Sequence, residues 1–119
     1  MRLTKTLIFL LTMVLAVRAS KPILERPSIK DQSRENPYAG QPAAEQAGRK
    51  LFQRECSSCH GHEAQGTARA PGLILKRASP GAIFWILRNG SLGGGMPSFA
   101  HLPEAQRWQL VTYLKTLGK

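Results

Sequence analysis

The chain has 119 residues, with 17 lysines and arginines against 7 acidic residues, and no internal repeat. A chain of this length forms one compact domain with a short tail or two, so one functional site is expected. The cations are scattered singly and in pairs, without a long basic cluster with interleaved aromatic residues, and nucleic acid is therefore not expected as a partner.

Residues 1–19 have the pattern of a secretory signal peptide. Arg2 and Lys5 precede an uncharged apolar run over residues 6–17, and Ala19 provides a small residue for cleavage. The run is shorter than the roughly 20 apolar residues that a membrane-spanning helix needs. We therefore expect cleavage after Ala19 and export to the periplasm. The alternative is an uncleaved segment that anchors the protein in the membrane.

Residues 20–40 differ in composition from the rest of the chain. They contain three prolines, mixed charges and only four side chains suited to burial. This composition predicts a flexible, extended leader or linker. The compact domain is expected over residues 41–119. A domain of this size usually needs an additional stabilising group, such as a cross-link or a bound metal, because its own core is small.

The first helix of this domain is predicted to start at Pro42 and to end near Cys56. Proline is tolerated at the first helical position because its missing N–H would have no partner there. Gly48 costs the helix about 1 kcal/mol relative to alanine, so we expect it to allow close contact with another helix.

The motif Cys56-Ser57-Ser58-Cys59-His60 follows this helix. Two cysteines separated by two residues and followed by histidine have the spacing that attaches haem through two thioether bonds while the histidine ligates the iron. We therefore expect one covalently bound haem c, held by Cys56 and Cys59, with His60 as an iron ligand.

Three other roles for the cysteines were weighed. A four-ligand zinc site would need more than Cys56, Cys59, His60 and His62, and no second cysteine pair exists. A thioredoxin-type redox pair would normally lie at a strand-to-helix junction of a βαβ fold, which this sequence lacks. A structural disulfide is the third alternative.

Residues 70–73, Ala-Pro-Gly-Leu, lie between the motif and the next predicted helix. An imidazole that ligates iron usually donates its other N–H to a carbonyl or carboxylate. The Pro71 carbonyl is the candidate acceptor for His60. The same residues would also make an ordinary Pro-Gly turn.

The second helix is predicted to start at Pro80, with Ser79 as its N-cap, and to stop at Gly90. Phe84 and Trp85 lie in the middle of it. The last helix is expected to begin at Pro103-Glu104 and to end at Gly118 and Lys119. No segment has the alternation of a strand.

Met96 is the only methionine outside residues 1–19, and it lies in a glycine-rich loop ahead of Pro97. The glycines would let the backbone pass close to a porphyrin, and the proline would stiffen the turn. We therefore expect Met96 to be the second axial ligand, although methionine more often fills gaps in a core. His101 is the competitor for this position, whereas His62 follows the motif too closely.

These residues together resemble the class I c-type cytochromes, specifically the short bacterial monohaem members. The resemblance covers about residues 47–118 and rests on Gly48, Phe52, the motif over residues 56–60, residues 70–73, Asn89-Gly90, residues 95–99, Trp108 and Tyr113. It implies an all-α cytochrome c fold of three to four helices around one haem. It also implies cofactor binding by Cys56, Cys59, His60, Pro71 and Met96, and a crossing that pairs Gly48 and Phe52 with Tyr113 or Trp108.

Ligation by histidine and methionine fills both axial positions, so we expect single-electron transfer between periplasmic redox partners rather than catalysis on a small-molecule substrate. The alternatives are an electron-accepting haem subunit of a periplasmic dehydrogenase or oxidase complex, and a haem enzyme or gas sensor with a labile sixth ligand.

Removal of residues 1–19 lowers the formal net charge from +10 to +7, because it takes away three cations and no acid. This charge favours partners with acidic docking faces, although it also serves simple solubility. The cations nearest in sequence to the expected ligand loops are Arg69, Lys76, Arg77 and Arg88.

Overall fold

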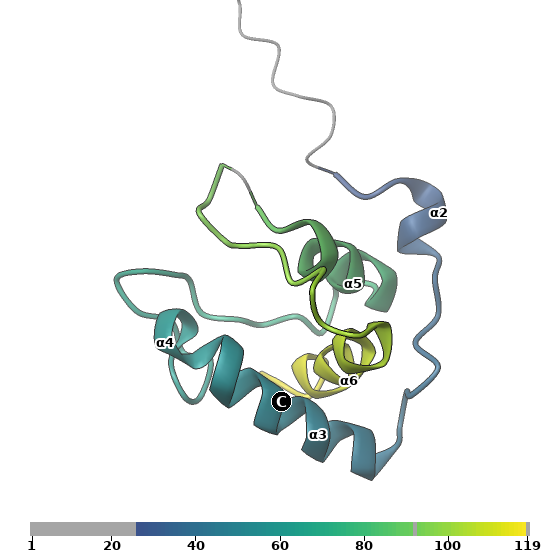
Figure 1. Ribbon diagram of the computed structural model, residues 1–119, viewed down its shortest axis with the longest axis horizontal. Helices are drawn as coiled ribbons and strands as arrows, with labels where there is room; N and C mark the ends of the chain where they lie inside the picture. The colour runs from purple at the N-terminus through teal and green to yellow at the C-terminus, as the bar shows by residue number, and fades with distance from the viewer. Residues whose placement is uncertain (1–25, 92, 119) are drawn as a thin grey trace, which may run out of the picture.

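The structure, a computed structural model, describes residues 26–91 and 93–118, so the predicted signal peptide lies outside the described residues. The helices of the described residues are, in chain order, α2 (Ile29–Gln32), α3 (Pro42–Glu55), α4 (Ser57–His60), α5 (Pro80–Asn89) and α6 (Glu104–Leu114) (Figure 1). These residues contain no strand, and Ser91 and Met96 form an isolated antiparallel bridge.

The ends of α3 and α5 confirm the boundaries predicted from their caps. Pro42 occupies the first turn of α3, and the helix ends as Cys56 N–H donates to the Phe52 carbonyl (2.8 Å). The Ser79 hydroxyl accepts from Ala82 N–H (3.2 Å) at the start of α5. Gly90 N–H closes the other end on the Ile86 carbonyl (2.7 Å).

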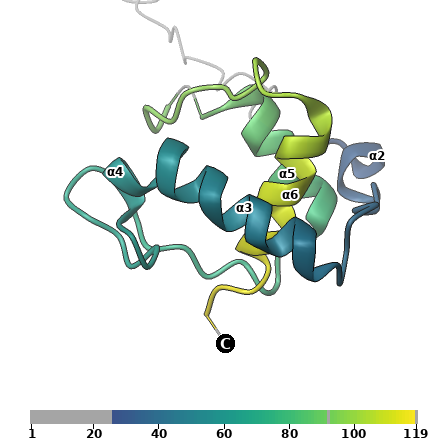
Figure 2. The same cartoon turned by 60° about the horizontal axis from the view of Figure 1, so that its bottom comes forward.

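Helix α3 crosses α6 at Gly48, and Figure 2 shows the two helices passing over each other. A Cβ at Gly48 would overlap the backbone carbonyl of Gln109 and lie 2.9 Å from the Tyr113 Cβ. One turn later, the Phe52 and Tyr113 rings meet at 5.4 Å between centroids. The predicted helix crossing, with Gly48 and Phe52 against Tyr113, is therefore confirmed.

The core lies between these two helices and α5. Phe52, Leu110 and Val111 are its largest fully buried side chains. The Phe84 ring on α5 stacks on Trp108 of α6 at 3.9 Å between centroids. Phe84 therefore belongs to the helix packing.

Helix α6 ends earlier than predicted, at Leu114, and residues 115–118 form turns. Lys115 follows the last helical residue, and its ammonium group leaves the helix to donate to three carbonyls, those of Leu75 (3.1 Å), Lys76 (2.6 Å) and Ala78 (2.7 Å). Just beyond the end of α6, the Thr116 hydroxyl donates to the Tyr113 carbonyl (2.6 Å). The side chains of the last predicted turn thus bond outside the helix ladder.

Residues 26–40 correct the prediction of an extended leader for the part of that segment that the structure describes. Ser28 and Asp31 form a reciprocal cap on α2. The Arg34 guanidinium bonds Glu104 (2.8 Å) and lies over the Phe84 ring (4.6 Å to the centroid). Asn36 Nδ2 donates to the Thr112 hydroxyl (2.8 Å).

The segment therefore packs on α5 and α6 mainly through polar side chains. This explains why a composition poor in apolar residues did not reveal it. Within the described residues, no helix has the length and apolarity that crossing a bilayer would require.

Candidate functional site

The motif cysteines and histidine lie on a single helical turn. Cys56 ends α3 and begins α4, and Gly61 terminates α4 with a φ of +86°, in the left-handed region that favours glycine. Cys56 is buried and Cys59 is exposed. The turn therefore holds one thiol against the core and the other at the surface.

His60 contacts the Pro71 carbonyl oxygen through Nδ1 at 2.8 Å. A carbonyl oxygen can only accept, so Nδ1 carries the proton. In the neutral ring this leaves a lone pair on Nε2, which is the state an imidazole needs to ligate a metal. The contact joins the two residues that the sequence analysis paired.

The loop over residues 61–78 folds back to bring Pro71 to His60. Gly66 N–H donates to the His60 carbonyl (2.7 Å), and Leu73 N–H donates to the Ala64 carbonyl (2.8 Å). Gly66 has a φ of +93°, and a Cβ there would lie 2.5 Å from the Gly72 nitrogen. Glycine at position 66 thus lets the backbone there lie against the backbone at Gly72, and this close approach positions the Pro71 carbonyl.

The environment of Cys56 disfavours a thioredoxin-type redox pair. Burial, aided by the Glu55 carboxylate, raises the pKa of the Cys56 thiol to about 12. Redox-active thiols of that class have lowered pKa values, since the thiolate is the reactive form. The two cysteines also form no disulfide with each other.

A zinc site finds no ligand set in residues 26–91 and 93–118, where no three His, Cys, Asp or Glu side chains gather closely enough to hold a metal ion. His62 is tied to α3, since its Nδ1 lies 2.7 Å from Gln53 Oε1 and its carbonyl accepts from Gln53 Nε2 (2.8 Å). Each of the three alternatives weighed for the cysteines therefore lacks support from the geometry.

Met96 lies in the loop that joins α5 to α6, and Figures 1 and 2 show this loop at the same end of the molecule as α4, away from α2. Its carbonyl accepts from Ser91 N–H (2.9 Å). Phe99 N–H then donates to the Leu87 carbonyl (2.7 Å), which fixes the loop to the end of α5. The Met96 side chain is half-buried against the core.

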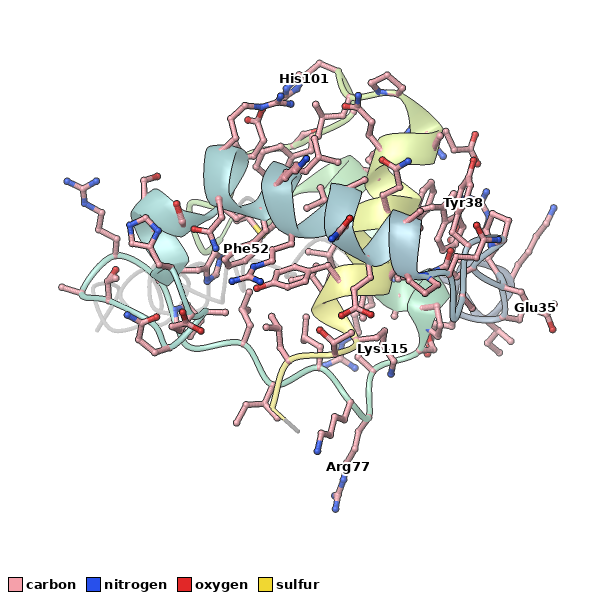
Figure 3. The ribbon with its side chains drawn as sticks, turned by 90° about the horizontal axis from the view of Figure 1, so that it is seen from below. Glu35, Tyr38, Phe52, Arg77, His101 and Lys115 are labelled. Atoms are coloured by element: carbon pink, nitrogen blue, oxygen red, sulfur yellow. The ribbon has the colours of Figure 1, made fainter. Side chains whose placement is uncertain are left out.

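His101, the competitor for the second ligand position, is exposed and lies beside the Phe99 ring at 6.0 Å between centroids. Figure 3 shows His101 at one side of the molecule and Arg77 projecting from the opposite side. All four cations expected near the ligand loops are exposed: Arg69, Lys76, Arg77 and Arg88.

Comparison with known families decides the class of protein. The family model described as cytochrome c oxidase, cbb3-type, subunit III matches residues 43–114. The chain belongs to this family. Its cytochrome c domain therefore includes the helix crossing, the cysteine and histidine motif and the Met96 loop.

The cytochrome c domain is also similar to a solved structure, that of cytochrome cL from the marine methylotrophic bacterium Methylophaga aminisulfidivorans MPT. The two share 25% sequence identity with a TM-score of 0.58, and the match covers 69% of this chain and 60% of that chain. The chain thus spans less than two thirds of the cytochrome cL chain. No curated protein matches the sequence.

These comparisons confirm the predicted class I c-type cytochrome, its all-α cytochrome c fold and its covalently bound haem c. The described residues fit that cofactor. Cys56 and Cys59 offer two thiols from one turn, and His60 contacts the Pro71 carbonyl through Nδ1, which leaves Nε2 as the ring nitrogen that could bind iron. Leu73, Leu75 and Met96 add apolar side chains at the edge of the core, only partly covered by protein. The function of such a domain is haem-based electron transfer with redox partner proteins.

The residues that shape the loop over residues 61–78 were not predicted from the sequence. Thr67 donates its hydroxyl to the Cys59 carbonyl, and its own N–H bonds the Ala70 carbonyl (2.9 Å). Lys115 holds the far end of the same loop. Only the glycines at positions 66 and 72 hinted at this close folding, because glycine marks places where backbones approach.

Proposed function

We propose that the protein is an exported monohaem c-type cytochrome that carries single electrons between periplasmic redox partners, with its haem iron ligated by His60 and Met96. The observation that carries this proposal is the 2.8 Å contact between His60 Nδ1 and the Pro71 carbonyl. The contact orients the ring and occupies Nδ1, so Nε2 would be the nitrogen that binds the iron.

The chain's own residues would have separate roles. Cys56 and Cys59 would form the thioether bonds, and Leu73 and Leu75 would keep water from the porphyrin. Met96 would supply a thioether ligand, which favours a higher reduction potential. The bound haem supplies a one-electron couple. If His60 and Met96 both held the iron, no ligand position would be left for a substrate, which would favour a carrier over an enzyme.

The test of this ligation uses two variants. Met96→Ala should abolish the weak near-infrared sulfur-to-iron band of the oxidised protein and lower its reduction potential. His101→Ala is the matched control and should change neither property. If the band is absent from the wild type, or is lost only in His101→Ala, methionine ligation is wrong. An absent band would then favour the haem enzyme or gas sensor with a labile sixth position.

The partners proposed for this carrier have acidic docking faces, which the mature charge of +7 would attract. Electron-transfer rates with the native donor should fall as salt rises, because ions screen charges beyond a Debye length of about 8 Å at physiological ionic strength. Charge reversal at Arg69, Lys76, Arg77 and Arg88 should lower the rate at low salt. A rate that is flat with salt and unaltered by reversal would contradict this part of the proposal.

A second candidate function is an electron-accepting haem subunit of a larger periplasmic complex. The observation in its favour is the match to a family described by an oxidase subunit. Purification of the native protein separates the two functions. A subunit should co-elute with its oxidase or dehydrogenase at moderate salt, whereas a free carrier should elute at its own mass.

A further inference from the structure

Three arginines converge on a cleft that lies between the segment after α2 and the facing parts of α5 and α6. The cleft has a volume of about 510 Å³ and is lined by Arg34, Phe84, Arg88, Ala100, Glu104 and Arg107. Figure 1 shows α2 beside α5, so that residues distant in sequence meet here. None of these residues belongs to the proposed haem site.

The positive charges in this cleft exceed the negative ones. Arg34 is paired with Glu104 at 2.8 Å, whereas Arg88 and Arg107 form no ion pair with any residue in the ranges 26–91 and 93–118. The hydroxyl and N–H of Ser28 bond the Asp31 carboxylate and lower the pKa of its carboxyl, and the charges of Arg34 and Arg88 lower it further. The Arg34 guanidinium is thus held in an ion pair, whereas those of Arg88 and Arg107 are not.

Arg107 is the least satisfied of the three. Its Nε donates to the neutral carbonyl of Leu102 (3.3 Å), and its guanidinium carbon lies 4.8 Å from the Phe84 ring centroid. Its Nη1 is buried and has no hydrogen-bond partner. A buried guanidinium nitrogen without a hydrogen-bond partner costs free energy, and an anion in the cleft that bonded it would offset that cost.

The lining also limits what kind of anion fits. The Phe84 and Trp108 rings stack on each other and are only 2% and 3% exposed, so neither offers a free face to a nucleobase. The guanidinium N–H groups remain, and their planar fork matches the paired oxygens of a phosphate or a carboxylate. We propose that the cleft binds a small oxyanion of this type, held chiefly by Arg88 and Arg107 with Arg34 beside them.

The cleft is connected to the loop that carries Met96. Ala100 lines it, and Ala100 N–H donates to the Ser98 hydroxyl (3.1 Å). The same hydroxyl donates to the Arg88 carbonyl, next to a proposed ligand for the anion. The Ala100 amide is therefore a reporter of occupancy that does not depend on the haem or on its axial ligands.

The experiment titrates the full-length mature holoprotein with sodium phosphate or with sodium acetate, while sodium chloride keeps the ionic strength constant. Saturable NMR shifts are expected at the Arg107 Nε–H and at the Ala100 N–H. Arg88→Gln and Arg107→Gln should each weaken binding at least about fivefold, which corresponds to roughly 1 kcal/mol. Arg49→Gln is the matched control, since it removes the same charge from an exposed position on α3 and should leave binding unchanged.

A further variant tests the direction of the effect. Glu104→Gln should strengthen binding, because it releases the Arg34 guanidinium from its ion pair and removes a negative charge from the lining of the cleft. Saturation by phosphate alone identifies a tetrahedral dianion, and saturation by acetate identifies a carboxylate. Shifts no larger than those with chloride alone, an equal loss in Arg49→Gln, or weaker binding in Glu104→Gln would overturn the proposal. Arg88 is exposed, so Arg88→Gln keeps the test valid if Arg107→Gln does not fold.

Discussion

The crossing of α3 and α6 and the loops beside it are held together by different interactions. At the crossing, Phe52, Leu110 and Val111 are fully buried, and Gly48 lets the two backbones touch. The loops over residues 61–78 and 90–99 bury fewer side chains, Ala64 and Phe99 among them, and depend more on single hydrogen bonds and on glycines with positive φ. Burial scales with apolar area, whereas one hydrogen bond contributes only about 1 kcal/mol.

This difference assigns the stability of the domain and the binding of the haem iron to different parts of the chain. The helix crossing buries the largest fully buried side chains, while the loops carry His60's partner Pro71 and the proposed ligand Met96. The free energy needed to open a segment with few buried apolar contacts is lower than the free energy of global unfolding. We therefore expect changes in the loops to alter the haem ligands before they unfold the domain, and changes at the crossing to do the reverse.

The largest effect is expected at the crossing. Gly48→Val places side-chain atoms where the Gln109 carbonyl and the Tyr113 Cβ lie. The variant should lower the free energy of unfolding by about 3 kcal/mol. Ala43→Val is the control, because it puts the same residue on the exposed side of α3 and should cost no more than about 0.7 kcal/mol. Equal losses in denaturant titrations would contradict the close contact.

The next effect is expected in the Met96 loop. Gly90 has a φ of +70°, and a Cβ there would lie 2.7 Å from the Met96 carbonyl oxygen. Gly90→Ala should therefore destabilise the loop by about 2 kcal/mol. The near-infrared band should disappear at a lower denaturant concentration than the helical circular dichroism signal does. Gly94→Ala meets only the Ser91 side chain, so in that variant the two signals should change together as in the wild type.

A smaller effect is expected where residues 26–40 join the core. Asn36→Ala removes the hydrogen bond from Nδ2 to the Thr112 hydroxyl, which still bonds the Trp108 carbonyl (3.0 Å). It also removes the bond that Asn36 Oδ1 accepts from Tyr38 N–H (2.9 Å). The loss should be about 1 kcal/mol. Glu35 next to it is exposed, as Figure 3 shows, and Glu35→Ala should have no measurable effect on the unfolding midpoint. If both variants behave alike, the segment contributes nothing through this bond.

The smallest effect depends on pH. A hydrogen bond from Arg34 holds the pKa of the Glu104 carboxyl below its usual value of 4.5. A lowered folded-state pKa stabilises the protein above the unfolded value, and this contribution is lost as pH falls through the folded value. Wild type and Glu104→Gln should therefore differ in urea midpoint at neutral pH, and the difference should shrink as the pH falls below 4.5. A difference that stays constant across this range would exclude the linkage.

The helices and the motif were predictable because local rules govern them. Proline at position 42, the Ser79 and Pro80 pair and the glycine at position 90 mark helix ends through backbone chemistry alone. The contact of His60 with Pro71 also followed from a local rule, since a ligating imidazole needs an acceptor for its other N–H.

The rest depended on contacts between distant residues. The Arg34 pair with Glu104 spans 70 positions, and no periodicity in residues 26–40 indicates it. The early end of α6 depends on Lys115, whose partners lie about 40 positions away. Polar contacts of this range leave no pattern in a single sequence, which is why the fold of residues 26–40 was mispredicted while the helix crossing was not.

The anchor formed by Lys115 has a consequence for chemical labelling. Its ammonium group uses all three N–H donors on the carbonyls of Leu75, Lys76 and Ala78, so its amine is engaged while the loop is closed. Lys30, Lys50 and Lys76 are exposed and should react with acylating reagents first. The acylation rate of Lys115 would then measure how often the loop over residues 61–78 opens in the native protein.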